Sequence, residues 1–138
     1  MTPGQSPEEV NRRLRLSIRR RRPITAMYDG CMRQLCPHRL GWNRSDERRV
    51  LCYQYGGDST TGLGGPGAKS NWRCLAVGKL SDVELTDGHW HTAPNHSRPQ
   101  TCIVRAEMDV EDFPEQLGSE SYLPWYSAFR LVRASGTR

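Results

Sequence analysis

The 138-residue sequence has no apolar run that approaches the roughly 20 residues a helix needs to cross a bilayer. Its N-terminus also lacks the apolar core of a secretory signal peptide. We therefore expect a cytoplasmic protein with no membrane partner. The chain contains neither a paired CxxC knuckle nor a GxxxxGK(S/T) phosphate loop, so the strongest sequence signatures of structural zinc and of nucleotide hydrolysis are missing.

Acidic residues are absent where basic residues are densest. The chain has 20 Lys and Arg against 15 Asp and Glu, which gives a net charge of +5. Of the eleven residues from Arg12 to Arg22, seven are arginine and none is acidic. The acidic residues gather instead in two stretches, 82–87 and 107–120. This distribution favours an anionic partner such as nucleic acid.

Cysteine is present in an odd number and without paired spacing. The five cysteines are Cys31, Cys36, Cys52, Cys74 and Cys102. We expect reduced thiols that pack as small apolar side chains inside strands. Cys31, Cys36 and His38, with His89 and His91, would be an alternative zinc ligand set. Their spacing is incomplete, and we predict no metal and no cofactor.

The N-terminal segment has the signals of a helix from Pro7 to about Arg21. Ser6 can cap the first turn, Pro7 suits the first helical position, and Glu9 completes a capping box. Pro23 ends the helix. An apolar stripe recurs every four residues at Val10, Leu14 and Ile18. We predict that this stripe packs on the rest of the domain.

The remaining surface of this helix is rich in arginine. Arg12, Arg15 and Arg19 can present guanidinium groups to phosphates, because each is a planar fork suited to bidentate contact. The alternative is that the arginines form a solvated charged face, or that the helix is a linker from a larger architecture. Phosphate binding and this alternative both stay open at this point.

After Pro23 the apolar pattern changes from helical to alternating. Asp29-Gly30 predicts a two-residue hairpin turn, because both residues tolerate positive φ. The predicted strands span residues 24–28, 31–36, 48–55, 71–77 and 80–86. Five strands in about sixty residues indicate a small barrel. The fold class that we predict is therefore mainly β, an N-terminal α-helix followed by a small five-stranded β-barrel.

Two further regions are less regular. The stretch from Gly56 to Ser70 has six glycines among fifteen residues and predicts an exposed loop, either a flap over a ligand or a tolerated insertion. Residues 101–110 alternate as a sixth strand would. The C-terminal stretch 119–132 is rich in aromatic residues. We predict that it closes the barrel or docks a partner, which includes a second copy of the chain.

Residues 24–90 contain a series of motifs in a defined order. An opening strand ends in a tyrosine, and an arginine, a Pro-x-x-Leu, an aromatic third strand and an arginine in the fourth strand follow. The residues of this series are Ile24, Tyr28, Arg33, Pro37 to Leu40, Tyr53 and Arg73. In this order and spacing, residues 24–90 resemble the WYL-domain family, with Lys79-Leu80 where the family tends to have Arg-Ile. The signature tripeptide itself is absent, and Arg48, Arg49 and Val50 stand near its place.

This resemblance implies an Sm-like barrel that senses a ligand or binds nucleic acid in bacterial or phage regulators of transcription. It suggests three parts: an Arg-rich helix in residues 1–23, a WYL-like barrel in 24–91, and an extension in 92–138 that packs on the barrel. Only one helix precedes the barrel. We therefore expect an accessory module and not a complete repressor.

The predicted function is binding of single-stranded nucleic acid or a nucleotide through a basic barrel surface. The candidate binding residues are Arg33, His38, Arg39, Tyr53, Arg73 and Lys79, together with Arg12, Arg15 and Arg19. Tyr53 or Tyr55 would offer a stacking face for a base, and Arg39 and Arg73 would contact phosphates. The alternative is a dimerisation or adaptor module without nucleic-acid binding. No residue pair indicates catalysis, so we predict that the protein is not an enzyme.

Overall fold

We analysed a computed structural model of the chain, which describes residues 4–58, 62–65, 68–93 and 102–113. These residues form one N-terminal helix and a six-stranded antiparallel sheet. The prediction of a mainly β fold behind an N-terminal helix is thus confirmed. The predicted C-terminal aromatic segment, 119–132, lies outside the described residues. Among the described helices, none combines the length and the apolar character that crossing a bilayer demands.

The helix α1 (Pro7–Arg20) begins where its capping residues predict. The backbone N–H of Glu9 donates to the Ser6 hydroxyl at 3.1 Å, and Pro7 opens the first turn. The helix ends at Arg21, whose φ of 52° is left-handed. Its apolar stripe of Val10, Leu14 and Ile18 is buried, as the four-residue spacing predicts.

The sheet contains five consecutive strands and one later strand. They are β1 (Ile24–Tyr28), β2 (Cys31–Trp42), β3 (Arg48–Gly57), β4 (Trp72–Ala76), β5 (Ser81–Leu85) and β6 (Arg105–Asp109). The strand order is β4-β3-β2-β1-β5, and β6 pairs with the second half of β2. Three single 3₁₀ turns accompany them: η1 (Lys69–Asn71), η2 (Val77–Lys79) and η3 (Val110–Asp112).

The hairpin between β1 and β2 forms at the predicted dipeptide. Asp29 and Gly30 have φ values of 51° and 74°, as a type I′ turn requires. The strand β2 is longer than predicted, because it continues past Pro37 to Trp42. The register with β3 shifts between Pro37 and Arg39, and this bulge accommodates a residue that has no N–H to donate.

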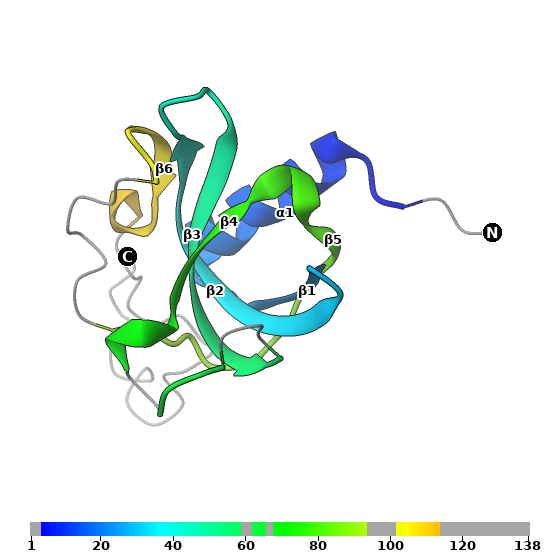
Figure 1. Cartoon of the computed structure of the whole chain (residues 1–138), viewed down its shortest axis with the longest axis vertical. Helices are drawn as coiled ribbons and strands as arrows, with labels where there is room; N and C mark the ends of the chain where they lie inside the picture. The colour runs from blue at the N-terminus through cyan, green and yellow to red at the C-terminus, as the bar shows by residue number, and fades with distance from the viewer. Residues whose placement is uncertain (1–3, 59–61, 66–67, 94–101, 114–138) are drawn as a thin grey trace, which may run out of the picture.

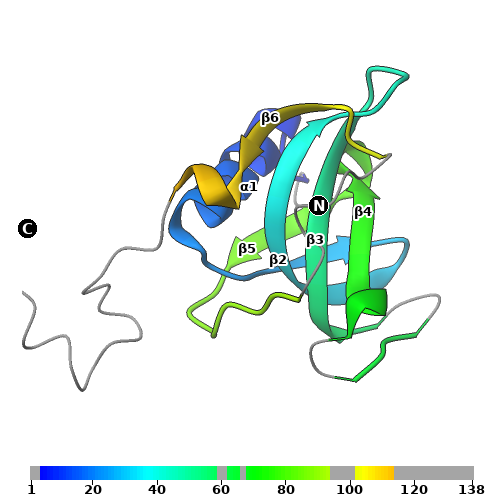
Figure 2. The same cartoon turned by 90° about the vertical axis from the view of Figure 1, so that its left-hand side faces the viewer.

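The sheet curls but does not close. Figures 1 and 2 show the long strands β2 and β3 bending strongly beside α1. The Tyr28 hydroxyl on β1 accepts a hydrogen bond from the Ala76 backbone N–H on β4 at 3.0 Å, although two strands separate β1 from β4 in the sheet. Within the described residues β4 and β5 are the two ends of the strand path and do not pair. The expected closed five-stranded barrel is therefore an open, curled sheet.

One hydrophobic core joins α1 to the sheet. We call the sheet face that carries this core the inner face, and the opposite face the outer face. The fully buried core residues include Leu14 and Ile18 from α1, with Ile24, Leu35 and Val50 from the sheet. Burying one such side chain stabilises the fold by about 1.5–3 kcal/mol. The helix is thus an integral part of the domain.

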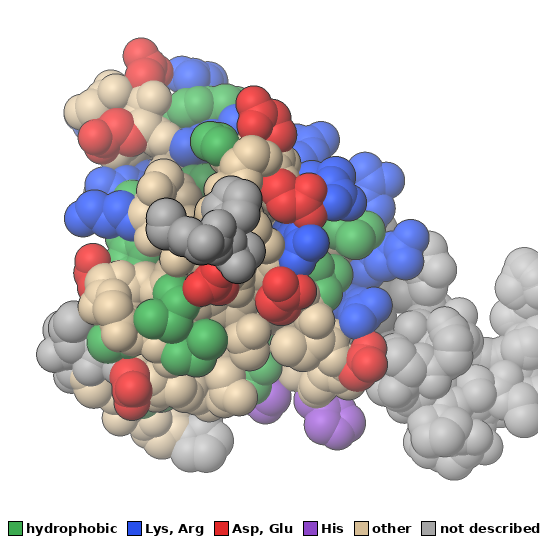
Figure 3. Space-filling view, turned by 90° about the vertical axis from the view of Figure 1, so that its right-hand side faces the viewer, with side chains coloured by type: hydrophobic (Ala, Val, Ile, Leu, Met, Phe, Trp, Pro, Cys, Tyr) green, Lys and Arg blue, Asp and Glu red, His purple; other side chains and the backbone are tan. Residues whose placement is uncertain are grey.

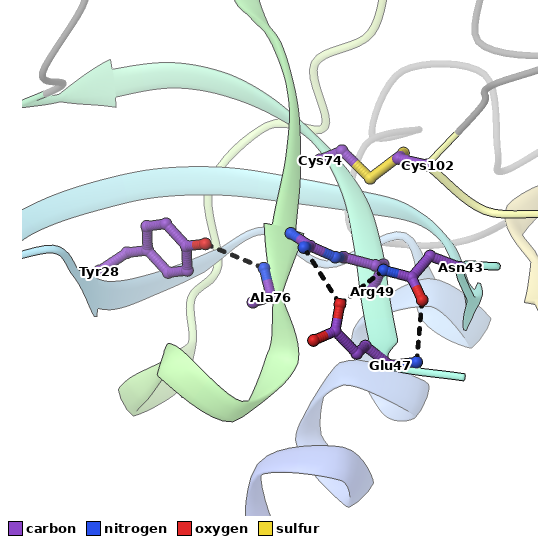
Figure 4. The surroundings of a disulfide bond; sticks show 7 residues. All are labelled: Tyr28, Asn43, Glu47, Arg49, Cys74, Ala76 and Cys102. Carbon is purple, nitrogen blue, oxygen red and sulfur yellow. Dashed lines mark hydrogen bonds and ion pairs between the residues drawn. A yellow bond between two sulfur atoms is a disulfide. The ribbon is translucent and has the colours of Figure 1, made fainter. Parts of the chain in front are cut away.

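The cysteines are not all free. Cys74 on β4 and Cys102 before β6 form a disulfide, with 6.5 Å between their Cα atoms (Figure 4). The prediction of five reduced thiols is wrong for this pair, because folding brings together two residues 28 positions apart. A disulfide also removes one argument for a reducing compartment, so the cytoplasmic location stays a prediction. The free cysteines among the described residues are Cys31, Cys36 and Cys52.

Candidate anion-binding site

The sheet register separates two arginines that were expected to share one surface. On β3, Leu51 pairs with Arg39 of β2 and with Cys74 of β4, whereas the next residue, Cys52, pairs with Arg73 of β4. Adjacent residues of a strand point to opposite faces. Cys52 belongs to the core, so Arg73 lies on the inner face and Arg39 on the outer face. The expected single basic surface with both Arg39 and Arg73 is not formed.

Arg39 is instead a structural ion-pair residue. Its Nε donates to the Asp109 carboxylate at 2.7 Å, and their side chains are only 19% and 14% exposed. Asp109 lies opposite Arg39 in the β2–β6 register. This pair holds β6 against β2 on the outer face.

Arg33 differs from the other described arginines because its side chain is buried. It pairs with Ala26 of β1 and Gly57 of β3, and its side chain points to the inner face with only 3% exposure. One guanidinium N–H donates to the Gln54 side-chain oxygen at 3.3 Å, and the group lies 5.1 Å from the Tyr28 ring centroid. Its Nε has no hydrogen-bond partner within the described part of the chain. Among the described residues no carboxylate lies within ion-pair distance of Arg33.

The Gln54 amide and the Tyr28 ring, which both contact the Arg33 guanidinium group, are held in place by their own hydrogen bonds. The Gln54 amide nitrogen donates to the backbone oxygens of Gly56 at 3.0 Å and Asp58 at 2.8 Å, which leaves the amide oxygen for Arg33. The Tyr28 ring is fixed by the hydrogen bond from Ala76. The guanidinium group is thus held by a neutral amide and an aromatic face, and neither of them neutralises its charge.

Arg73 brings a second guanidinium to the same inner face. Burial lowers the pKa of Arg73, and the nearby positive charge of Arg33 lowers it further. Its side chain donates to the backbone oxygens of Ser70 at 2.5 Å and Gly62 at 2.8 Å. Arg73 therefore binds the glycine-rich segment that follows β3, next to Arg33.

These contacts make an electrostatically incomplete site. Burying a cation without a counter-ion costs several kcal/mol, and buried charges in proteins are usually paired. Arg33 therefore favours an anion in its neighbourhood, and guanidinium groups match the oxygens of phosphates and carboxylates in pairs. We call Arg33, Arg73, Gln54 and Tyr28 the Arg33 site.

Sequence reasoning named two of the four residues of the Arg33 site, and Gln54 and Tyr28 were missed as site residues. A signal for Gln54 was present, since it is a polar residue inside the apolar third strand between Cys52 and Gly56. Tyr28 was part of the family pattern but was not assigned to the site.

The other predicted barrel residues lie elsewhere. His38 is 2% exposed and lies between the rings of Trp72 and Trp90, with both ring centroids 4.8 Å away. Its Nδ1 is 2.7 Å from the Cys36 backbone oxygen and its Nε2 is 2.9 Å from the Thr92 hydroxyl. These contacts give His38 a packing role. Lys79 is exposed on η2.

Neither tyrosine proposed as a stacking face shares the Arg33 site. Tyr53 is 2% exposed and its hydroxyl donates to the Ala68 backbone oxygen, so its ring belongs to the packed interior. The Tyr55 ring already stacks on His91, with centroids 4.2 Å apart. His91 thus occupies one face of the Tyr55 ring.

The arginines of α1 are mostly engaged by carboxylates of the domain itself. Arg12 pairs with Glu9 at 2.6 Å, and Arg15 pairs with Glu107, which also binds Arg48. Arg19 lies over the Phe113 ring, 5.3 Å from its centroid. Figure 3 shows Lys and Arg side chains with acidic side chains among them on one side of the molecule.

The same helix borders an open hollow of about 450 Å³. Its lining residues are Glu8, Asn11, Arg12, Arg15, Leu16 and Arg19. The structure thus brings the three predicted α1 arginines together, but away from the Arg33 site.

The zinc alternative finds no support in the described part of the chain. No group of three or more His, Cys, Asp or Glu side chains there could hold a metal ion. Cys36 is buried, and burial raises the pKa of its thiol to about 12, which disfavours the thiolate that binds zinc.

Comparisons of the chain with protein-family models, with curated proteins and with solved structures returned no match.

Proposed function

We propose that the protein is a small regulatory or accessory module that binds a phosphate-bearing ligand, either single-stranded nucleic acid or a nucleotide, at the Arg33 site. The observation that carries this proposal is that Arg33 is buried without a carboxylate partner among the described residues. A phosphate group would supply the missing negative charge and accept hydrogen bonds from both guanidinium groups.

The position of the site favours a thin ligand. Arg33 lies on the inner face of a curled sheet and is almost completely covered. A single strand or a nucleotide can present a phosphate on a narrow chain, whereas a duplex presents its phosphates on a broad rigid surface.

As part of the proposal, we assign the domain to an Sm-like arrangement of the kind implied by the resemblance to WYL domains. The helix before β1, the strand order β4-β3-β2-β1-β5 and the η2 turn between β4 and β5 support this assignment. The hydrogen bond from Ala76 to the Tyr28 hydroxyl supports it as well, because it connects β4 to β1, which are not neighbours in the sheet. Regulation of transcription is the role that this assignment implies.

The test compares two arginine variants on opposite faces of β2. A fluorescein-labelled single-stranded oligonucleotide is titrated with wild type, Arg33→Met and Arg39→Met by anisotropy at two salt concentrations. Because hydrogen bonds to charged groups contribute about 1.5–3 kcal/mol, Arg33→Met should weaken binding at least tenfold and flatten the salt dependence. Arg39→Met is the matched control and should bind as wild type does. Equal binding by wild type and Arg33→Met would exclude the Arg33 site.

A further inference from the structure

In the described part of the chain, the strand that carries Arg73 has one hydrogen-bonded neighbour strand. The five-residue β4 is an end strand of this sheet and pairs there with β3. On its C-terminal side Ala76 is tied to Tyr28. At its centre, directly after Arg73, Cys74 is bonded to Cys102. The disulfide is thus the covalent anchor of the strand that positions Arg73.

The other end of the disulfide is attached to a well-fixed part of the sheet. Cys102 precedes Ile103, which is buried, and the Val104 backbone N–H donates to the Trp42 oxygen of β2 at 2.9 Å. Ile103 passes so close to Gly41 that a Cβ atom on Gly41 would lie 2.7 Å from its side chain. The bond therefore ties the end strand β4 to a segment that is itself packed on β2.

We propose that the Cys74–Cys102 disulfide is a reducible staple that holds Arg73 beside Arg33, so that the redox state of this bond sets the affinity of the Arg33 site for its anion. This inference depends on the proposed function. In the oxidised protein the two guanidinium groups are preorganised, and the ligand does not bear the cost of ordering β4. In the reduced protein β4 loses its covalent link to the segment packed on β2, while its ladder with β3, the Tyr28 contact and the ring contacts of Trp72 remain.

The chemistry needs a dithiol reductant. One thiolate of the reductant attacks a sulfur of the disulfide, and the other cysteine leaves as a thiolate that takes up a proton. The second thiol of the reductant then attacks the mixed disulfide and releases the protein cysteine that was attacked first. Two protein thiols form, and the reductant becomes a disulfide. Cys74 and Cys102 are both only partly buried, which gives a reductant access.

The neighbouring free cysteines are poor competitors in this exchange. Cys36 and Cys52 are buried, and burial raises the pKa of both thiols, so almost no thiolate is present at neutral pH. Reoxidation by a small-molecule disulfide, which takes up the two electrons and two protons and becomes two thiols, should therefore return the Cys74–Cys102 bond and not a bond to Cys36 or Cys52.

The experiment measures binding and strand mobility in both redox states. The labelled single-stranded oligonucleotide is titrated with oxidised wild type, with wild type in dithiothreitol, and with the double variant Cys74→Ser/Cys102→Ser. We expect about fivefold weaker binding or more after reduction, the range typical of allosteric coupling. The double variant should bind as reduced protein does, with no response to dithiothreitol. Amide exchange of β4 should accelerate on reduction, while that of β1 should not.

The outcomes separate this inference from the proposed function. Equal affinity of oxidised and reduced wild type would overturn the redox inference and leave the Arg33 site standing. Absence of binding by the oxidised protein would overturn both. If the double variant does not fold, reduced wild type alone decides the question, because the covalent bond is its only difference from the oxidised protein.

Discussion

The arginines of α1 and those of the inner sheet face have opposite electrostatic surroundings. On α1, Arg13 reaches Glu84 of β5 and Arg15 reaches Glu107 of β6. On the inner face, Arg33 is buried next to a second arginine and, among the described residues, its guanidinium group reaches an amide and a ring but no carboxylate. The dense run of arginines thus fastens the helix, whereas the isolated arginine in a strand is the stronger candidate for ligand binding. Charge density along the sequence is a poor guide to which cation remains unneutralised.

The largest effect is expected from the apolar side of α1. Leu14 is fully buried in the core that joins the helix to the sheet. Leu14→Ala should lower the free energy of unfolding by about 2–5 kcal/mol, the cost of a large-to-small core substitution. Chemical denaturation measures this change, and Leu16→Ala, at a partly exposed position, is the control. A loss below about 1 kcal/mol would show that α1 is only loosely attached.

A smaller loss is expected when the shared carboxylate of the helix arginines is neutralised. Glu107 accepts from both Arg15 and Arg48, and its side chain is 20% exposed. Glu107→Gln should lower the free energy of unfolding by roughly 1–3 kcal/mol, between the values for exposed and buried ion pairs. The same denaturation experiment applies. Unchanged stability would contradict the fastening role that we assign to Arg15.

The smallest effect concerns the pH dependence of the first helical turns. Hydrogen bonds from Arg12 and Arg13 hold the pKa of Glu9 below its ordinary value. Because the pKa of Glu9 is lower in the folded state, its ionised carboxylate stabilises the fold. This contribution to the free energy of unfolding is fully present above about pH 5 and is lost as the pH falls toward the folded-state pKa. The stability difference between wild type and Glu9→Gln should therefore be constant from pH 7 to 5 and shrink from pH 5 to 3. A difference that grows on acidification would have the wrong sign.

Local signals in the sequence predicted the elements that depend on local chemistry. Ser6 and Pro7 start α1 as expected, and Asp29-Gly30 forms the β1–β2 turn. The end of β2 was not predicted, because Pro37 was taken as a strand terminus and the bulge that admits it depends on pairing with β3.

The same bulge explains why the site was predicted only in part. Arg33 and Arg39 are six residues apart, so simple alternation places both on one face. The register shift between Pro37 and Arg39 reverses the alternation, and Arg39 points outward while Leu40 returns to the core. The disulfide escaped prediction for a similar reason, since the approach of Cys102 to Cys74 is set by how a distant segment crosses the sheet.

The central claim is that Arg33 is a buried cation whose counter-ion is the ligand. It is tested most directly by thermal unfolding of wild type, Arg33→Met and Arg39→Met in increasing inorganic phosphate at constant ionic strength. A ligand that binds only the folded state raises the unfolding temperature. We predict that phosphate stabilises wild type and Arg39→Met, while Arg33→Met shows no such rise and, without phosphate, unfolds no lower than wild type. An equal rise in all three proteins, or a marked loss of stability in Arg33→Met alone, would contradict the claim.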